Sequence, residues 1–377
     1  MHKPTLPLAC TATVVWKHPR TLRQRMSLTT ATSGCSNAVA EHEEITGISV
    51  VVPMRNERAH IQECLNSLLN QTYNQNAYEI IVVDGGSSDG SSGIVRSMQA
   101  SHPNLFVIDN PARITPISMN LGIREAKKDV IVIAGAHAIY CSDFLTNCVK
   151  KLQETGADVV GGPVQTVPRN DSFGARLTAA ILSSHFGVGN SNFRTSLKEG
   201  YVDTVPFGAY RLGVLNKVGL FNEKLVRNQD NDLSARIRQA GGRIYSSPEI
   251  SAIYVPASSF GDLLRQTYKK AQWHFFTMRE NVGALGLRHL APALFLLALA
   301  CLVVLATSQY WARVACTFTV LAYFVVGFGY SLGSSRQKSL GVALCLPAAC
   351  FIFHCAYGLG TLVGTRYLVT VTNEQTP

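Results

Sequence analysis

The residues best suited to chemistry are aspartates at the end of a predicted strand or at the start of a predicted helix. Asp84 ends an apolar run and is followed by Gly85 and Gly86. Two glycines let the backbone turn sharply beside a ligand, and the carboxylate can accept a hydrogen bond from a base or a ribose. Asp230 and Asp232 lie two residues apart, just before a helical pattern. Charge that complements the helix dipole could explain this pair, and could fully explain Asp232.

The elements that position these residues follow an α/β pattern. Between Gly47 and Gly162, apolar β-branched runs alternate with segments of helical period, which predicts a mostly parallel sheet with crossover helices. In such sheets ligands bind at the carboxyl ends of the strands. A dinucleotide-binding dehydrogenase is disfavoured because its glycine fingerprint is absent. The predicted strands are Ile48–Pro53, Glu79–Asp84, Leu105–Asp109, Val130–Ala134 and Asp158–Val160.

The C-terminal part of the chain has the composition of a membrane protein. The 377 residues are 47% hydrophobic and only 15% charged, against about 25% charged in an ordinary soluble domain. Three runs without Asp, Glu, Lys or Arg are each near or above the ~20 residues that cross a bilayer as helix. They are Leu290–Thr307, Val314–Gly333 and Leu340–Thr365. We expect three transmembrane helices rather than a soluble helical bundle, because the runs lack polar faces.

Charge predicts the orientation of these helices. The short loop between the second and third runs holds Arg336 and Lys338, so it and the body are expected in the cytoplasm and the C-terminus outside. The net charge of +10 suits anionic lipid or a polyanionic substrate. Nucleic acid is disfavoured as a partner, since no reader motif accompanies the charge. The ten cysteines contain no Cys-x-x-Cys pair, so neither a disulfide framework nor a zinc site is predicted.

Six motifs in order carry a resemblance to a known family. They are Val51–Glu57 (VVPMRNE), Val82–Gly90 (VVDGGSSDG), Ala136–Ala138 (AHA), Gly187–Gly189 (GVG), Val202–Gly208 (VDTVPFG) and Arg227–Leu233 (RNQDNDL) continuing to Arg236. The stretch from Ile48 to about Met278 resembles glycosyltransferase family 2, the inverting transferases of nucleotide-activated sugars with the Rossmann-like GT-A fold. Within that family it most resembles the succinoglycan glucosyltransferase-like branch of bacterial polysaccharide enzymes.

The resemblance implies a domain organisation and a donor site. A basic, poorly ordered leader is expected over residues 1–46, a GT-A domain over 47–259, an interfacial amphipathic helix over 260–288 and a membrane region over 289–377. In such transferases the Asp that ends the second strand holds the uracil of a UDP-sugar, and Asp84 matches it. The positions expected to contact the nucleotide-sugar are Pro53, Asn56, Glu57, Asp84, Gly85, Asn120 and His137. Loop capping would explain Asn56 and Glu57 almost as well, and a satisfied helix residue would explain Asn120.

The resemblance also implies catalytic residues. Asp230 matches the base of the family's Glu-Asp motif, with Gln229 in place of Glu. That base takes the proton of the acceptor hydroxyl. Arg236, one turn further on, could pair with a carboxylate and orient it. The residues expected near the acceptor or the diphosphate are Arg194, Asp203, Arg211 and Arg227.

The predicted metal site departs from the family pattern. Relatives carry an aspartate at the end of the fourth strand that binds a divalent ion, whereas this chain has Gly135, which leaves His137 as a weak ligand. A lone imidazole suits Mn²⁺ better than Mg²⁺. Either metal binds weakly, or positive side chains stabilise the diphosphate, or catalysis has decayed.

These features predict the activity and the partners. Processive relatives hold their polymer with a Gln-x-x-Arg-Trp motif, but here Lys269 and Gln272 precede Trp273, so addition of a single sugar is favoured. We expect transfer of one hexose, from UDP-glucose or a close analogue, to a polyprenyl-diphosphate-linked oligosaccharide. The expected location is the cytoplasmic face of the inner (plasma) membrane, with other polysaccharide-assembly proteins as possible partners. The alternative is a catalytically silent membrane-bound scaffold, and Gly135 keeps that alternative open.

Overall fold

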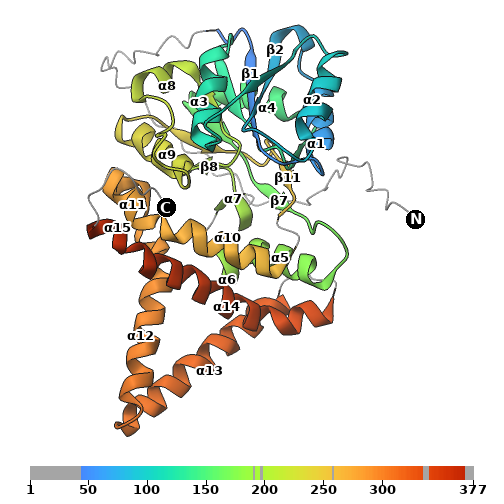
Figure 1. Ribbon diagram of the computed structural model, residues 1–377. Helices are drawn as coiled ribbons and strands as arrows, with labels where there is room; N and C mark the ends of the chain where they lie inside the picture. The colour runs from blue at the N-terminus through green and yellow to red at the C-terminus, as the bar shows by residue number, and fades with distance from the viewer. Residues whose placement is uncertain (1–43, 190–191, 196–197, 257–258, 334–338, 370–377) are drawn as a thin grey trace, which may run out of the picture. The chain divides into compact units, whose positions relative to one another are not determined.

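The computed structural model describes residues 44–369 except the short segments 190–191, 196–197, 257–258 and 334–338 (Figure 1). The predicted leader over residues 1–46 therefore lies almost wholly outside the described residues. The same is true of the basic loop residues Arg336 and Lys338, so the predicted orientation in the membrane stays a prediction. From Ile45 onward the chain belongs to one structural unit.

The main sheet confirms the predicted α/β fold. Its strand order is β3-β2-β1-β4-β9-β6-β10-β8, and β1 to β4 pair in parallel. β9 runs antiparallel between β4 and β6, and β8 pairs antiparallel with β10 at the far edge. The strands are β1 (Ile48–Met54), β2 (Tyr78–Asp84), β3 (Leu105–Asp109), β4 (Val130–Ile133), β6 (Val159–Gly161), β8 (Gly200–Tyr201), β9 (Ala209–Arg211) and β10 (Ile244–Ser246). The carboxyl ends of β1, β2 and β4 thus meet at one edge.

Helices cover both faces of this sheet. Val50 and Val52 point to one face and Val51 to the other, and all three are fully buried, as expected for strands covered on both sides. The first face is covered by α1 (Ile61–Leu69), α2 (Ser91–Gln99) and α4 (Phe144–Thr155). The second is covered by α3 (Thr115–Glu125), α8 (Leu212–Val218) and α9 (Gln229–Gln239). A short 3-10 turn, η1 (Gln75–Ala77), precedes β2.

A second, three-stranded sheet lies beside the carboxyl edge of the first. Its order is β5-β11-β7, where β11 pairs antiparallel with β5 and parallel with β7. The strands are β5 (Ala138–Tyr140), β7 (Val164–Thr166) and β11 (Ala252–Tyr254). Because β5 directly follows the end of β4, this sheet brings Tyr254 next to the loop that ends β4.

Short helices connect the sheets to the apolar C-terminal part. They are α5 (Phe173–Ser183), α6 (His185–Val188), α7 (Asn192–Thr195), α10 (Phe260–Gln272), α11 (His274–Glu280), η2 (Val282–Ala284) and η3 (Leu287–His289). The segment 260–288 is therefore two helices and two 3-10 turns rather than one amphipathic helix. α10 is amphipathic, with Leu263 and Ala271 buried and Arg265 exposed.

The prediction of three transmembrane helices is wrong, because one of the three helices is too short to cross a bilayer. Within the part of the chain that the structure describes, two helices are long and apolar enough to cross a bilayer, namely α13 (Tyr310–Gly333) and α14 (Leu340–Gly364), which α15 (Arg366–Val369) follows. The first apolar run forms only α12 (Ala291–Leu305), of 15 residues. At 1.5 Å per residue α12 is about 22 Å long, which is shorter than a hydrocarbon core of about 30 Å. The run ends early because the chain turns at residues 306–309.

Candidate active site

The end of β2 forms the first wall of the site. Asp84, its last residue, is only 4% exposed. Its Oδ1 accepts hydrogen bonds from the amide of Ser87 at 3.0 Å and from the hydroxyl of Ser87 at 2.6 Å. No group of the described residues donates to Oδ2 of Asp84. Pro53, in the neighbouring strand β1, pairs in register with Val83. The turn thus fixes the carboxylate and leaves one oxygen for a ligand.

The loops that follow β1 and β2 are bonded to each other. Asn56 has a left-handed backbone, with φ of 55°, a conformation that Asn tolerates better than most residues. Its amide donates to the hydroxyl of Ser87 at 2.9 Å, and its Oδ1 accepts from the amide of Ser88 at 2.8 Å. The amide of Gly85 donates to the carbonyl of Met54 at 2.8 Å. The polar groups of Asn56 therefore shape the loop, and the structure gives this residue a structural role.

The end of β4 is crowded at the position where relatives carry an aspartate. A Cβ atom at Gly135 would lie 2.7 Å from Cε1 of Phe207, closer than real Cβ contacts. The backbone of Gly135 is not left-handed, so lack of space rather than backbone conformation requires glycine here. The ring of Phe207 also packs edge-on against Tyr140.

The side chains beside Gly135 do not form a metal site. His137 lies with its Nδ1 3.1 Å from Oε1 of Glu57, and both side chains are partly exposed. Within the described part of the chain, no group of three or more His, Cys, Asp or Glu side chains is placed to hold a metal ion. Two ligands are fewer than the three or more protein ligands usual for zinc, and Mg²⁺ and Ca²⁺ prefer oxygen. These residues do not form a closed metal site of their own, and an ion held mainly by the donor's diphosphate with His137 as a weak ligand stays a prediction.

A row of side chains leads from His137 toward the partly buried Arg194. The rings of His137 and Tyr254 are 5.4 Å apart, and the guanidinium of Arg194 lies 5.0 Å from the centre of the Tyr254 ring. Nη1 of Arg194 also lies 3.4 Å from the hydroxyl of Thr166, a long contact. Burial lowers the pKa of Arg194, while Tyr254 raises it. This arginine supplies a positive charge near the strand ends.

The two aspartates of α9 have different surroundings. Asp232 is buried, accepts hydrogen bonds from Arg236 and Asn281, and forms an ion pair with Arg236 at 3.0 Å. Arg236 also donates to three backbone carbonyls of residues 218–220. Asp230 is exposed, and none of the described residues forms a hydrogen bond with it. Arg236 therefore anchors α9 through Asp232, and the expectation that it orients Asp230 is not supported by this geometry.

Lys270 interacts electrostatically with Asp230 and with two arginines. Lys270 of α10 is exposed, yet the surrounding protein removes enough water to lower its pKa. Asp230 raises the pKa of Lys270, whereas Arg194 and Arg227 lower it. Burial and the charge of Asp230 both raise the pKa of the Tyr210 phenol. Positive charge thus gathers around Lys270, within electrostatic range of the carboxylate of Asp230, and such charge can offset that of a departing diphosphate.

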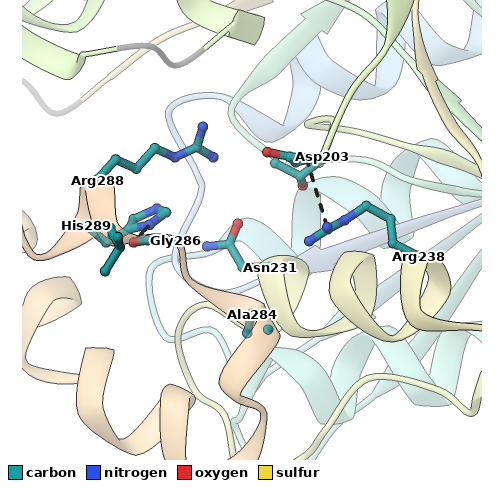
Figure 2. Close-up of a pocket in the computed structure, with 10 residues that line it drawn as sticks. Asp203, Asn231, Arg238, Ala284, Gly286, Arg288 and His289 are labelled. Carbon is teal, nitrogen blue, oxygen red and sulfur yellow. Dashed lines mark hydrogen bonds and ion pairs between the residues drawn. The ribbon is translucent and has the colours of Figure 1, made fainter.

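A cavity opens next to Asp230, on the side of η2 and η3. Its volume is about 300 Å³, at the lower end of the range for small-molecule sites. Figure 2 shows Asn231, Arg288 and His289 around it, with Asp203 and Arg238 on its far side, 4.0 Å apart. The cavity is lined by Asp203, Thr204, Asn231, Arg238, Gly283, Ala284, Gly286, Leu287, Arg288 and His289. Asp203 is therefore separated from the strand ends and belongs to this cavity.

Two predicted site residues lie elsewhere. Asn120 is buried in α3, donates to the carbonyl of Phe221 and to Glu223, and accepts from the amide of Phe221. Its amide group is fully engaged, so it pins this segment instead of facing a nucleotide. Arg211 pairs in register with Val130, the first residue of β4, at the edge opposite the site. It donates there to the carbonyls of residues 152 and 157.

The fold brings further residues to the site that were not expected there from the sequence. Lys270 was assigned only to an interfacial helix, although it lies at the position where processive relatives carry their polymer-binding motif. The hydroxyl of Ser87 follows Asp84 by three residues, which is a usual spacing for a turn of this kind. No local signal marks Tyr254, because β11 reaches the site by pairing with strands far away in sequence.

This architecture matches one family. Residues 49–219 match the model of glycosyl transferase family 2. The chain carries a family 2 glycosyltransferase domain. Two relatives extend the similarity beyond that glycosyltransferase domain, each 27% identical over 84% of this chain. They are succinoglycan biosynthesis protein ExoA of Rhizobium meliloti, of which 95% is covered, and a dolichyl N-acetyl-alpha-D-glucosaminyl phosphate glucuronosyltransferase of Methanococcus voltae, of which 96% is covered.

Solved structures support the same fold. The mannosyltransferase PcManGT from Pyrobaculum calidifontis, determined with GDP-Man and Mn²⁺, aligns with a TM-score of 0.58 at 20% identity. The alignment covers 84% of this chain and 87% of the mannosyltransferase. This likeness shows the GT-A fold. The family 2 domain and the two relatives support a glycosyltransferase, similar to enzymes of polysaccharide and glycan biosynthesis.

Proposed function

We propose that this glycosyltransferase transfers a single hexose, with inversion, from a nucleotide-sugar to a lipid-linked saccharide at the membrane surface. The observation that carries the proposal is Asp230. It is an exposed carboxylate without a side-chain hydrogen bond among the described residues, set at the start of α9 within electrostatic range of Lys270, which in turn lies within range of Arg194 and Arg227. The names of the relatives support a lipid-linked acceptor and a role in polysaccharide assembly.

In the proposed reaction Asp230 accepts the proton of the acceptor hydroxyl while that oxygen attacks the anomeric carbon. The bond from this carbon to the diphosphate oxygen breaks, and the nucleoside diphosphate leaves with the electron pair. Lys270, Arg194 and Arg227 offset the charge that develops on the leaving group. Asp84 holds the nucleotide through its free Oδ2. We propose UDP-glucose or a close analogue as donor.

The surroundings of Trp273 support addition of one sugar rather than polymerisation. Trp273 is 3% exposed and packs in a cluster with Leu225, Phe276 and Tyr367. A buried ring offers no face on which a growing saccharide can stack. We further propose that the catalytic domain lies on the cytoplasmic face of the plasma membrane, where other polysaccharide-assembly proteins would supply the acceptor.

Transfer assays with the full-length protein test this proposal. A panel of UDP- and GDP-sugars would be offered with a synthetic polyprenyl-diphosphate-linked monosaccharide, in Mg²⁺, Mn²⁺ or EDTA. We expect transfer of one sugar with at least one donor, and loss of transfer in Asp230→Asn. Nucleotide binding without transfer under every condition would instead favour the silent scaffold, the second candidate that the occupied space at Gly135 supports.

A further inference from the structure

The three apolar helices form the sides of a triangle (Figure 1). α12 starts against α14, where a Cβ atom at Gly358 would lie 2.6 Å from the carbonyl oxygen of Pro292. α13 returns to α14 at Gly327, whose Cβ would lie 3.0 Å from Cβ of Pro347. These two contact points on α14 are about 16 Å apart at 1.5 Å per residue. α14 therefore joins the two open ends of the hairpin formed by α12 and α13.

Both ends of α14 contact the body, by which we mean residues 45–289. At the start, a Cβ at Gly341 would lie 3.6 Å from the ring of Phe173, the first residue of α5. Beyond the end of α14, Tyr367 packs in one cluster with Leu225 and Trp273. Its carbonyl accepts a hydrogen bond from Nη1 of Arg279 at 3.3 Å. A helix that crossed the bilayer could not touch the same body at both ends.

The C-terminal end of α14 lies along α10. A Cβ at Gly360 would lie 2.4 Å from the carbonyl oxygen of Tyr268, and one at Gly364 would lie 2.5 Å from that of Gln272. The two backbones are therefore in close contact over a full turn. The other face of α10 carries charge, and the side chain of Arg265 is 71% exposed. Since charged side chains are costly in hydrocarbon, α10 and the helix beside it lie at the level of the membrane surface.

The face of α14 that points away from the body is exposed and uncharged. Its exposed residues, which share one side of the helix, are Leu340, Gly341, Leu344, Cys345, Ala348, Ile352 and Leu359. This outward face continues the exposed apolar surfaces of α12 and α13, where Val304 and Phe318 are 67% and 71% exposed. A helix with one face packed in a protein core and the other in lipid is apolar all round, which is why its sequence looks like a span.

We propose that α14 lies flat in one leaflet of the membrane, with its outward face among the acyl chains. The hairpin of α12 and α13 is then the part that enters the bilayer. Both ends of α14, and Tyr367 just beyond it, lie on the same side as the glycosyltransferase domain. This topology replaces the sequence-based expectation that the C-terminus faces outward.

Labelling of added cysteines tests the sidedness. Three full-length variants would be compared with wild type in sealed vesicles: Glu125→Cys on the exposed surface of the domain, Ser339→Cys before α14, and a cysteine appended after Pro377. We expect a membrane-impermeant maleimide to label all three to the same extent, above the wild-type background, in the same vesicle population. If Ser339→Cys or the appended cysteine required detergent while Glu125→Cys did not, α14 would cross the bilayer and the proposal would be wrong.

Fluorescence quenching tests the depth of α14. Leu344→Trp, Ile352→Trp and Leu359→Trp would be reconstituted in lipids brominated either near the headgroup or near the chain end, with wild type as the background for the native tryptophans. A helix in the leaflet surface predicts the same shallow depth for all three. Deepest quenching at Ile352→Trp with shallower flanking positions would indicate a span. Absence of quenching at all three would show a face covered by protein and would equally overturn the proposal.

Discussion

The two walls of the candidate active site, one made by β1 and β2 and the other by α9 and α10, differ in how many of their polar groups already form hydrogen bonds within the protein. On the wall made by β1 and β2, Asn56, Gly85 and one oxygen of Asp84 are held by hydrogen bonds within the protein. On the wall made by α9 and α10, none of the described residues forms a hydrogen bond with the side chain of Asp230 or of Lys270. The first wall is thus preorganised to receive a donor of fixed shape. The second keeps its charges for interactions that strengthen in the transition state.

The largest effect is expected from a substitution on the wall made by α9 and α10, at Asp230. Asp230→Asn keeps the shape of the side chain but cannot accept the proton, so we expect transfer to fall about 10²- to 10⁴-fold with nucleotide affinity unchanged. Initial rates of sugar transfer and calorimetric titration with UDP measure the two properties. Asp143→Asn, an exposed aspartate just before α4, is the matched control and should transfer at the wild-type rate. A rate for Asp230→Asn within tenfold of wild type would assign the base elsewhere.

The next largest effect is expected from a substitution on the wall made by β1 and β2, at Asp84. Asp84→Ala removes a buried, charge-assisted hydrogen bond to the nucleotide, which is worth about 1.5–3 kcal/mol. We expect the dissociation constant for UDP to rise by the corresponding factor in calorimetric titration. Asp109→Ala is the control, because Asp109 also ends a strand but is exposed and paired with Arg96. Equal UDP affinities in Asp84→Ala and wild type would remove Asp84 from the donor site.

A smaller effect is expected when positive charge is removed from the wall made by α9 and α10, at Lys270. Loss of one charged contact in Lys270→Ala should lower kcat about tenfold. Because burial, Arg194 and Arg227 lower the pKa of Lys270, its charge is lost as pH rises through a value below the usual ~10.4. The rate should therefore decline at alkaline pH, and Lys270→Arg should move this decline to higher pH. Lys269→Ala, its exposed neighbour, should leave the pH profile unchanged, whereas an unshifted profile in Lys270→Arg would contradict the assignment.

The last prediction concerns the crowded end of β4, where a substitution is expected to change stability and metal binding. Gly135→Asp places a side chain against Phe207, so we expect a loss of about 1–3 kcal/mol in the free energy of unfolding and no gain in Mn²⁺ affinity. The double variant Gly135→Asp/Phe207→Ala makes room for the carboxylate and should bind Mn²⁺ more tightly than wild type. Thermal unfolding and titration with Mn²⁺ give both quantities. Tighter Mn²⁺ binding by the single variant would show that Phe207 moves aside easily.

The difference between the walls also explains what the sequence could predict. Five strands and the start of α9 follow from local patterns of apolar residues, and these place Asp84 and Asp230 correctly on their elements. The bonded state of a side chain depends instead on partners distant in sequence. Asn120 is satisfied by Phe221, about a hundred residues away, and Arg211 lies at the wrong edge because β9 runs antiparallel. α14 looked like a span because the composition of a helix does not show what each of its faces touches.

The packing of α10 sets the height at which the reaction occurs. One face of this helix carries Lys270 toward Asp230, and its backbone at Tyr268 and Gln272 touches α14. An α-helix with its side chains is about 10–12 Å across, so the reacting atoms lie about one helix diameter above the lipid-facing helix. So short a distance between the reacting atoms and the lipid-facing helix favours acceptors whose reactive hydroxyl is close to the lipid. An enzyme built in this way selects its substrate by distance from the bilayer as well as by sugar identity.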